Sequence, residues 1–228
     1  MNKIIFFDAG PVISLVMSRL IWILPKLKQK YGGKFYITPA VQKELVERPL
    51  TIKRFEFEAL QVLQLIENKT FEIYDKVPQQ NVNNLIKLAN NSFSIQGKYM
   101  DIIQAGEMES VVCALETRAQ AVVMDERTLR LLMENSSEMV SLLKSRFQQE
   151  VVANQQNIRL FKEQTAGVDI IRSLELIAVS YKMGLLNEYI PKQKGGRELL
   201  LDSVLWAVKM NGCAATSQEI EDMKKILK

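Results

Sequence analysis

Residues 3–11 read Lys-Ile-Ile-Phe-Phe-Asp-Ala-Gly-Pro, an apolar run followed at once by an acid and a turn. Residues 3–7 predict a short buried strand, and the residues after it predict a turn into a helix with Pro11 in its first turn. Three further short apolar runs predict strands over residues 34–37, 71–74 and 120–124. Helical segments separate these runs, and such alternation is typical of an α/β layer fold with a mainly parallel sheet.

The second half of the chain is predicted to be mostly helical. A long helical region is expected over residues 128–149, and residues 158–161 form the last predicted strand. Beyond that strand the apolar residues have helical spacing. We therefore expect an α/β domain over residues 1–165 and a helical C-terminal extension over residues 166–228. The extension is expected to pack on the domain or to mediate oligomerisation.

The composition of the 228 residues restricts the chemistry. The chain contains no histidine, which excludes every catalytic triad and every metal site that needs an imidazole. The two cysteines, Cys113 and Cys213, are too few for a disulfide framework or a four-cysteine metal site, and they suit a reducing cytoplasm, where we expect the protein. The formal net charge of +4 permits an anionic partner without identifying one.

The N-terminal residues 1–24 are apolar enough to raise the question of a signal peptide or a membrane span. Asp8 lies inside the apolar part and Arg19 interrupts the remainder, so the segment lacks the uncharged run of about 18 residues that a span needs. We expect neither a signal peptide nor a membrane partner.

Acidic residues stand at predicted strand ends and beside predicted helices. Asp8 and Asp125 come directly after strands, where a parallel sheet places its ligand site, although Asp there is also an ordinary turn or N-cap residue. Glu44 lies beside the buried stripe of a helix predicted over residues 39–47. Its alternative role is a side chain that reaches water from the edge of that stripe.

Two more acids, Glu107 and Glu109, stand in the first turn of a predicted helix, where the helix dipole favours carboxylates for purely structural reasons. Glu109 aligns with Val112 and Cys113 on the inward side of this helix, and Glu107 is the freer of the two. The sequence alone leaves open which of them joins the other acids.

These elements could bring Asp8, Glu44, Glu109 and Asp125 to one end of the sheet. Carboxylates a few ångströms apart raise one another's pKa unless a cation is present. Mg²⁺ and Mn²⁺ bind through a few carboxylates plus water, need no histidine and serve substrates that carry phosphates. The acids therefore favour metal-dependent phosphodiester hydrolysis, in which the ions activate water and stabilise the leaving oxygen.

Four segments, residues 4–13, 37–45, 106–112 and 122–127, resemble in order and spacing the catalytic half of the PIN-domain nucleases. The relevant members include PIN proteins related to the toxins of toxin–antitoxin modules. The resemblance covers roughly residues 1–165 and implies a three-layer α/β/α fold with a five-stranded, mainly parallel sheet.

The same resemblance implies a metal-dependent endoribonuclease that binds Mg²⁺ or Mn²⁺ and cuts RNA. The implied catalytic acids and metal ligands are Asp8, Glu44, Glu109 and Asp125, with Glu107 as a further metal ligand that competes with Glu109 for the third position. Two residues depart from the family. Gly10 stands where Ser or Thr is frequent, and Glu109 stands where Asp is common.

Other expectations concern the substrate and the partners. Arg127 and Arg130 follow the fourth acid, and either guanidinium could hold a phosphate of the substrate. Their alternative role is that of ordinary arginines on a helix surface. The partners that the resemblance implies are an RNA substrate, a candidate antitoxin protein and a second copy of the chain in a homodimer.

Two other functions fit parts of the sequence. The first is a catalytically silent PIN-fold module that docks a partner through the tail from Asp169 onward, and the glycine at position 10 supports it. The second is a phosphotransfer protein that uses Asp8 at the end of the first strand. The second acid that such proteins carry near this position is absent.

Overall fold

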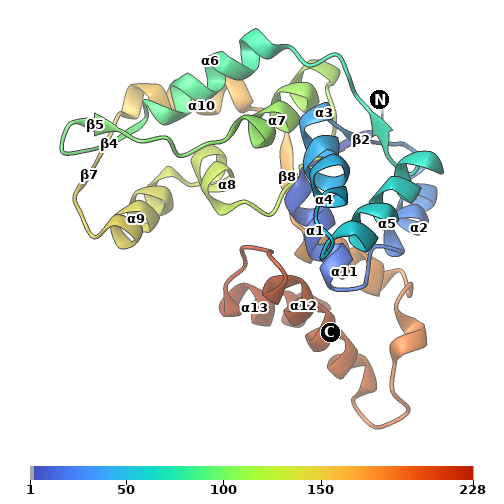
Figure 1. Ribbon diagram of the computed structural model, residues 1–228. Helices are drawn as coiled ribbons and strands as arrows, with labels where there is room; N and C mark the ends of the chain where they lie inside the picture. Colours follow the sequence, from blue (N-terminus) through green and yellow to red (C-terminus); the bar gives the residue numbers. More distant parts are fainter. Residues whose placement is uncertain (1–2, 228) are drawn as a thin grey trace.

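The computed structural model describes residues 3–227, and a five-stranded sheet lies at its centre (Figure 1). The strand order is β3-β2-β1-β6-β8, and every neighbouring pair is parallel. The strands are β1 (Ile4–Phe7), β2 (Lys34–Ile37), β3 (Glu72–Ile73), β6 (Ala121–Val123) and β8 (Asp169–Ile171). Residues 1, 2 and 228, which our expected domain bounds include, lie outside the described residues.

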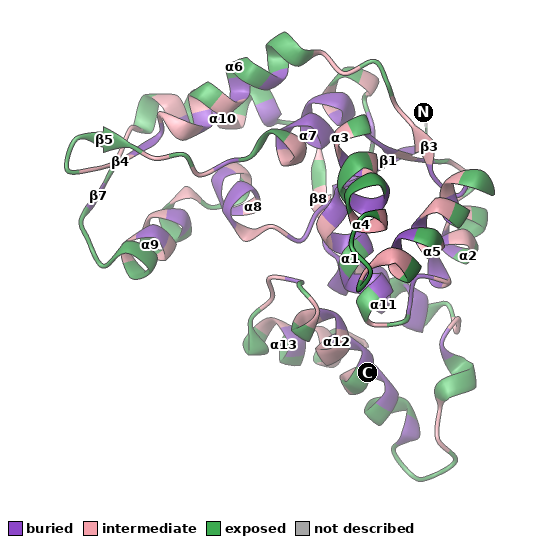
Figure 2. Cartoon of the chain, viewed as in Figure 1, coloured by how far each residue is buried: buried purple, intermediate pink, exposed green. Residues whose placement is uncertain are grey.

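Alternating residues of β1 enter two separate apolar cores, one on each face of the sheet. Ile5 and Phe7 pack in the first core and Ile4 and Phe6 in the second. The first core is covered mainly by α1 (Ala9–Met17), α2 (Ile23–Tyr31), α5 (Glu56–Glu67), α11 (Ser173–Lys182) and α12 (Gly196–Met210). The second is covered by α6 (Gln79–Asn90), α7 (Ala105–Thr117), α8 (Arg127–Glu134), α9 (Ser136–Phe147) and α10 (Gln155–Thr165). Figure 2 shows this burial, which confirms the three-layer α/β/α fold.

The helical segment after β2 is irregular at Glu44. It consists of α3 (Pro39–Gln42), a π-helical turn, η1 (Lys43–Glu47), and α4 (Arg48–Leu50). Thr38 caps its start, because the Thr38 hydroxyl oxygen accepts a hydrogen bond from the Val41 amide at 3.4 Å. A π-helical turn changes the direction of the side chains after it, and such turns are frequent at functional sites. The helix predicted over residues 39–47 is present, but Glu44 does not occupy a regular α-helical position.

The prediction of a strand over residues 158–161 is wrong. These residues lie inside α10, whose start is capped by Asn154 through a 3.1 Å hydrogen bond from the Asn157 amide. Ile158 and Phe161 are three residues apart and both are buried, which is the spacing of one helix face. The fifth strand is instead β8, so the domain boundary expected at residue 165 would cut through the sheet.

A second, small sheet was not expected from the sequence. It is antiparallel, has the order β5-β4-β7, and extends together with α9 to one side of the main sheet (Figure 1). Its strands are β4 (Phe93–Ile95), β5 (Lys98–Tyr99) and β7 (Val151–Ala153).

The last helices are tied to the sheet by ion pairs. After a short 3₁₀ turn, η2 (Asn187–Tyr189), the chain forms α12 and α13 (Ser217–Leu227). Arg172 follows β8 directly, and its guanidinium pairs with Glu175 at 2.6 Å and with Glu219 of α13 at 2.5 Å. Arg172 is only 8% exposed, so its end of these pairs is shielded from water, and the pair with Glu219 holds the start of α13. The connection between α12 and α13 is thereby held against the carboxyl edge of the sheet.

The apolar N-terminal stretch forms β1 and the two short helices α1 and α2, which are separated at Arg19 by a backbone φ of 59°. No helix within residues 3–227 combines the length and the hydropathy of a membrane-spanning segment.

Candidate active site

A cavity of about 380 Å³ lies at the carboxyl ends of β1 and β6. The acids that line it come from separate elements: Asp8 follows β1, Glu44 lies in η1, Glu107 lies in the first turn of α7, and Asp125 and Glu126 connect β6 to α8. The other lining residues are Gly10, Gln104, Gly106, Arg127, Gly212 and Ala214. Five carboxyl groups thus share one cavity although they come from distant parts of the chain.

Asp8 is nearly inaccessible to solvent, with 8% of its surface exposed. Burial raises the pKa of Asp8 to about 6, and repulsion from Glu44 and Asp125 adds to the rise. The backbone amides of Ala9 and Gly10, at the start of α1, oppose this rise. The negative charge of Asp8 is therefore only partly compensated by the protein groups around it.

Glu107 shows the same behaviour more strongly. Burial raises the pKa of Glu107 to about 8, and the negative charges of Glu126, Asp8 and Glu44 contribute. One Glu107 oxygen also accepts a hydrogen bond from the Gln104 amide at 3.4 Å, as part of a capping box at the start of α7. The Glu107 side chain therefore both caps the start of α7 and lines the cavity.

Asp125 is held by hydrogen bonds rather than by charges. Its Oδ2 accepts 2.8 Å bonds from the hydroxyl groups of Ser14 and Ser173, and its Oδ1 accepts a 2.8 Å bond from the Ser173 amide. The fourth acid is therefore fixed in position, at 3% exposure, by residues from α1 and α11.

Glu109, expected as the third acid in competition with Glu107, is not among the residues that line the cavity. It is buried on another side of α7, where its Oε1 accepts a hydrogen bond from the Gln79 side-chain amide at 3.1 Å. Residues 107 and 109 are two apart in a helix, so their side chains point about 160° away from each other. The acids that the structure brings together are Asp8, Glu44, Glu107 and Asp125, with Glu126 beside them.

The two arginines differ in their relation to this cavity. Arg127 lines it, and its guanidinium also pairs with Glu138 at 2.7 Å. Arg130 is not among the lining residues; it pairs with Glu134 at 3.5 Å and with Glu219 at 3.8 Å. Of these two arginines only Arg127 lies at the cavity, and Arg130 belongs to the ion pairs that hold α13.

Two serines and one loop at the site were not predicted. Ser14 lies one helical turn after Gly10 in an apolar helix and supplies a hydroxyl to the site, as the family residue at position 10 would. Ser173 and the loop with Gly212 and Ala214 come from the segment expected to be an extension. A Ser four residues beyond Gly10 was the one sequence signal available, since residues i and i+4 share a helix face.

Gly10→Ala should stabilise the metal-free protein by about 0.5–1 kcal/mol, because alanine is the better helix residue. A methyl group at position 10 would lie 3.6 Å from Asp125 Cβ and 3.7 Å from Asp8 Oδ2, which are ordinary contacts. Urea unfolding measures the change. Gly32→Ala is the matched control with the opposite sign, because Gly32 has a φ of 65°. A loss of stability in Gly10→Ala would show that the site does not tolerate a side chain there.

The donor set fits a hard divalent cation that keeps part of its water shell. Within residues 3–227, no three Asp, Glu or Cys side chains lie close enough together to hold a metal ion as they stand. Burial and, to a smaller extent, the mutual repulsion of the acids nevertheless raise the pKa of Asp8 and of Glu107, and a cation would relieve that repulsion. Mg²⁺ is usually held by one or two carboxylates plus water, and Mn²⁺ suits the same oxygen ligands.

The fold and the cavity define an α/β protein with a carboxylate site at the carboxyl edge of a parallel sheet. A family model described as a PIN domain matches residues 4–141, more than half of the chain. The chain belongs to the PIN-domain family, and the resemblance seen in its sequence is confirmed. The match includes all the acids of the cavity, whereas Ser173 and the loop at Gly212 lie beyond it. No curated protein and no solved structure matches the chain.

Proposed function

We propose that this protein is an endoribonuclease that hydrolyses RNA phosphodiester bonds with the help of Mg²⁺ or Mn²⁺. The PIN domain is a nuclease-type fold, which supports the reaction class. The single observation that carries the proposal is the shared cavity of Asp8, Glu44, Glu107 and Asp125. In it, burial and mutual repulsion raise the pKa of Asp8 to about 6 and that of Glu107 to about 8.

We assign a role to each acid of the cavity from the groups that surround it. Asp8, Glu44 and Glu107 would hold the metal, because each contributes to the unrelieved negative charge. Asp125, which Ser14 and Ser173 hold in position, would orient the water molecules and carboxylates around the metal. The metal, when bound, activates water and stabilises the leaving oxygen of the phosphodiester.

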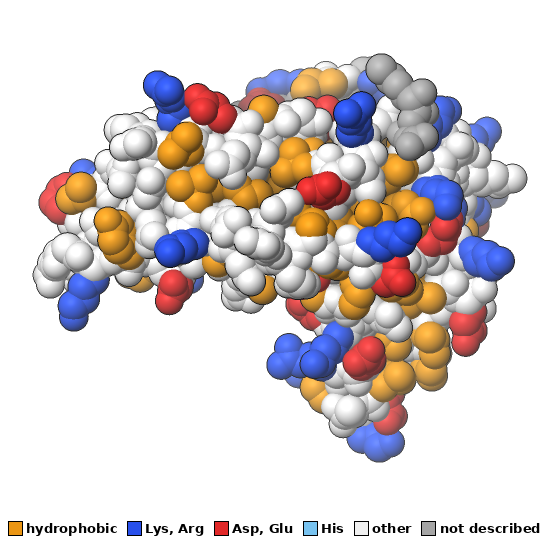
Figure 3. All heavy atoms as spheres, turned by 90° about the horizontal axis from the view of Figure 1, so that it is seen from above, with side chains coloured by type: hydrophobic (Ala, Val, Ile, Leu, Met, Phe, Trp, Pro, Cys, Tyr) orange, Lys and Arg blue, Asp and Glu red, His pale blue; other side chains and the backbone are white. Residues whose placement is uncertain are grey.

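Arg127 is the cation that we assign to the substrate. Its guanidinium borders the acids and can pair with a phosphate oxygen next to the scissile bond. The same guanidinium pairs with Glu138 at 2.7 Å, which restrains the Arg127 side chain. Figure 3 shows acidic and basic side chains interspersed over one face of the molecule, so on that face a local contact is better supported than a broad basic surface.

The proposal is tested by comparing Glu107→Gln with Glu109→Gln. Glu107→Gln should weaken Mn²⁺ binding about tenfold or more and slow cleavage of a labelled single-stranded RNA, because it removes a ligand. Glu109→Gln should leave both unchanged, since Glu109 contacts Gln79 outside the cavity. Calorimetry and gel-based cleavage assays give the two readouts.

The same experiment decides between the nuclease and its alternatives. Wild-type protein that binds no Mn²⁺ at millimolar concentration would favour a catalytically silent PIN module. Equal losses in the two variants would show that the cavity is not the metal site. Covalent labelling of Asp8 by a phosphoryl donor would instead support phosphotransfer.

We also propose that the protein forms a homodimer through its C-terminal segment. Among the described residues of this segment, six large apolar side chains are exposed: Val179, Met183, Tyr189, Leu199, Met210 and Ile226. Apolar side chains that gather into one exposed patch are typical of interaction surfaces. Light scattering tests the dimer, and the neighbouring gene tests whether an antitoxin is the alternative partner.

A further inference from the structure

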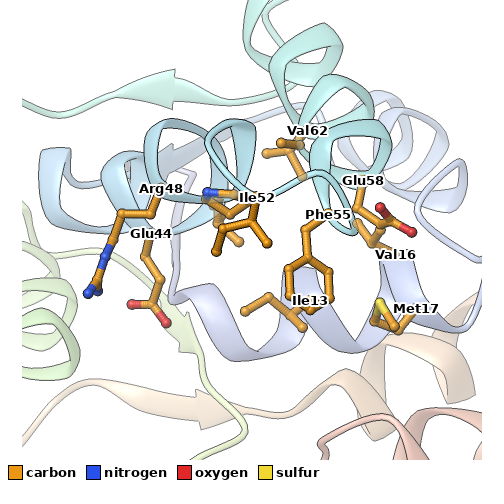
Figure 4. A pocket seen from close by; sticks show the side chains of 12 residues that line it. Ile13, Val16, Met17, Glu44, Arg48, Ile52, Phe55, Glu58 and Val62 are labelled. Atoms are coloured by element: carbon orange, nitrogen blue, oxygen red, sulfur yellow. The ribbon is translucent and has the colours of Figure 1, made fainter.

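A second cavity, of about 310 Å³, lies beside the acidic one and is almost entirely apolar. It is enclosed by α1, the segment from η1 to α4, and the start of α5 (Figure 4). Glu44 lines both cavities, so the two are neighbours at one side chain. Whatever enters the apolar cavity therefore lies next to the carboxylates of the proposed metal centre.

One polar group in this cavity lacks a partner. The Oε2 atom of Glu58 is buried and has no hydrogen-bond partner among the described residues. It lies among apolar neighbours that include Val16 and Val62, where a carboxylate oxygen without a donor is unfavourable. A ligand that brings an N–H group to Glu58 would remove that cost.

The apolar walls suit a flat ring. Phe55, at the start of α5, offers an aromatic face, and Ile13 and Ile52 line the cavity with it, each about half exposed. Arg48 lies one turn after Glu44, and its guanidinium has no ion-pair partner within residues 3–227. Figure 4 places Glu44 and Arg48 toward one end of the cavity and Glu58 toward the other.

We propose that this cavity holds the base of the nucleotide next to the scissile phosphodiester, an inference that rests on the proposed ribonuclease function. The base stacks on Phe55, an amino group on its edge donates to Glu58, and Arg48 pairs with the adjoining phosphate. Adenine, guanine and cytosine carry such an amino group. Uracil is disfavoured, because its single N–H donor lies between two carbonyl oxygens.

A nucleotide fits these observations better than a protein segment does. The cavity shares a wall with the acids, which a substrate must reach. It also combines a carboxylate oxygen of Glu58 with the guanidinium of Arg48, and neither has a partner among the residues that the structure describes. A single-stranded substrate follows, because a base can enter the cavity only when it is unpaired.

Binding of labelled oligo(A), oligo(C) and oligo(U) ribonucleotides in EDTA tests the inference without metal or cleavage. Wild-type protein should bind oligo(A) and oligo(C) about tenfold more tightly than oligo(U). Phe55→Ala should weaken oligo(A) binding about tenfold, because stacking is lost. Glu58→Gln should bring oligo(U) binding closer to oligo(A) binding, because the glutamine amide can donate to a uracil carbonyl oxygen as well as accept a hydrogen bond.

Two variants of α5 serve as matched controls. Phe57→Ala removes a ring that is 71% exposed and does not line the cavity, and Glu56→Gln changes an acid that pairs with Lys53 on the surface. Both should bind all three probes as the wild type does. Circular dichroism verifies that each variant is folded.

Failure of the inference is distinct from failure of the proposed function. Three results would each overturn the base pocket even if Mn²⁺-dependent cleavage is found: equal binding of the three probes, no binding at all, or wild-type binding by Phe55→Ala. The occupant of the cavity would then be a protein segment or a second copy of the chain. The predicted binding pattern without Mn²⁺ binding would keep the pocket and overturn the nuclease.

Discussion

Asp8→Asn should abolish metal-dependent cleavage and, at the same time, make the metal-free protein more stable at pH 7. Loss of a carboxylate ligand should slow cleavage by about 100-fold or more, because a catalytic metal contributes several kcal/mol to the transition state and about 1.4 kcal/mol is a factor of ten. The gain in stability has a separate cause. Asp8 is buried beside Glu44 and Asp125, and asparagine removes the charge from that cluster.

The pKa of Asp8 determines whether Asp8→Asn raises or lowers the free energy of unfolding at a given pH. The pKa of Asp8 is about 6 in the folded protein against an ordinary value of 3.8, so the folded state binds this proton more tightly. The corresponding stability is complete below pH 3.8 and is lost as the pH rises through 6. Asp8→Asn avoids that loss, which amounts to about 3 kcal/mol at most at pH 7.

Urea unfolding in EDTA near pH 4 and at pH 7 measures the effect. The variant should match the wild type near pH 4 and exceed it at pH 7, and Mn²⁺ should reverse the order by stabilising only the wild type. Asp75→Asn, on the loop after β3 and away from the cavity, should change nothing. An Asp8→Asn protein that is less stable at pH 7 would show that Asp8 is a structural cap.

Asp125→Ala, unlike Asp8→Asn, should lower the free energy of unfolding. It removes the acceptor of three hydrogen bonds and leaves the Ser173 amide and the Ser14 and Ser173 hydroxyls without it. Each buried group without a partner costs about 1–3 kcal/mol, so we expect a loss of about 3 kcal/mol or more in the free energy of unfolding.

Asp125→Asn is the matched comparison, because its amide oxygen still accepts from the Ser173 amide and its size is unchanged. It should cost much less stability than Asp125→Ala in the same urea titration. If Asp125→Ala is as stable as the wild type, the three hydrogen bonds do not fix the fourth acid, and its place in the site needs another explanation.

The sequence predicts the central sheet because its signals are local. The strand 4–7, its acid and the helix start after it are adjacent, and the same holds around residues 120–126. Around residues 34–39 a strand is likewise followed at once by a helix start. Strand β8 was missed because it is three residues long and starts with an exposed Asp169, whereas Ile158 and Phe161 form an apolar run that strands and helices share. The small sheet was missed for the same reason, since its strands are two or three residues long.

The site was predictable in part. Asp8 and Asp125 can be predicted as site residues because each comes directly after a strand. Ligands of parallel sheets bind outside the carboxyl ends of the strands. The choice between Glu107 and Glu109 depends on the rotation of α7 against the sheet, which no local signal gives. Ser173 could not be found, because its contact with Asp125 joins positions 48 residues apart.

The dependence of Asp125 on Ser173 also bears on how the protein is made. Synthesis proceeds from the N-terminus, so all five acids of the cavity leave the ribosome before Ser173, β8 and the loop at Gly212. A growing chain therefore carries the acids without the groups that arrange them. If the protein cuts RNA, the arrangement delays that activity until Ser173 and the loop at Gly212 have emerged, which spares the message being translated up to that point.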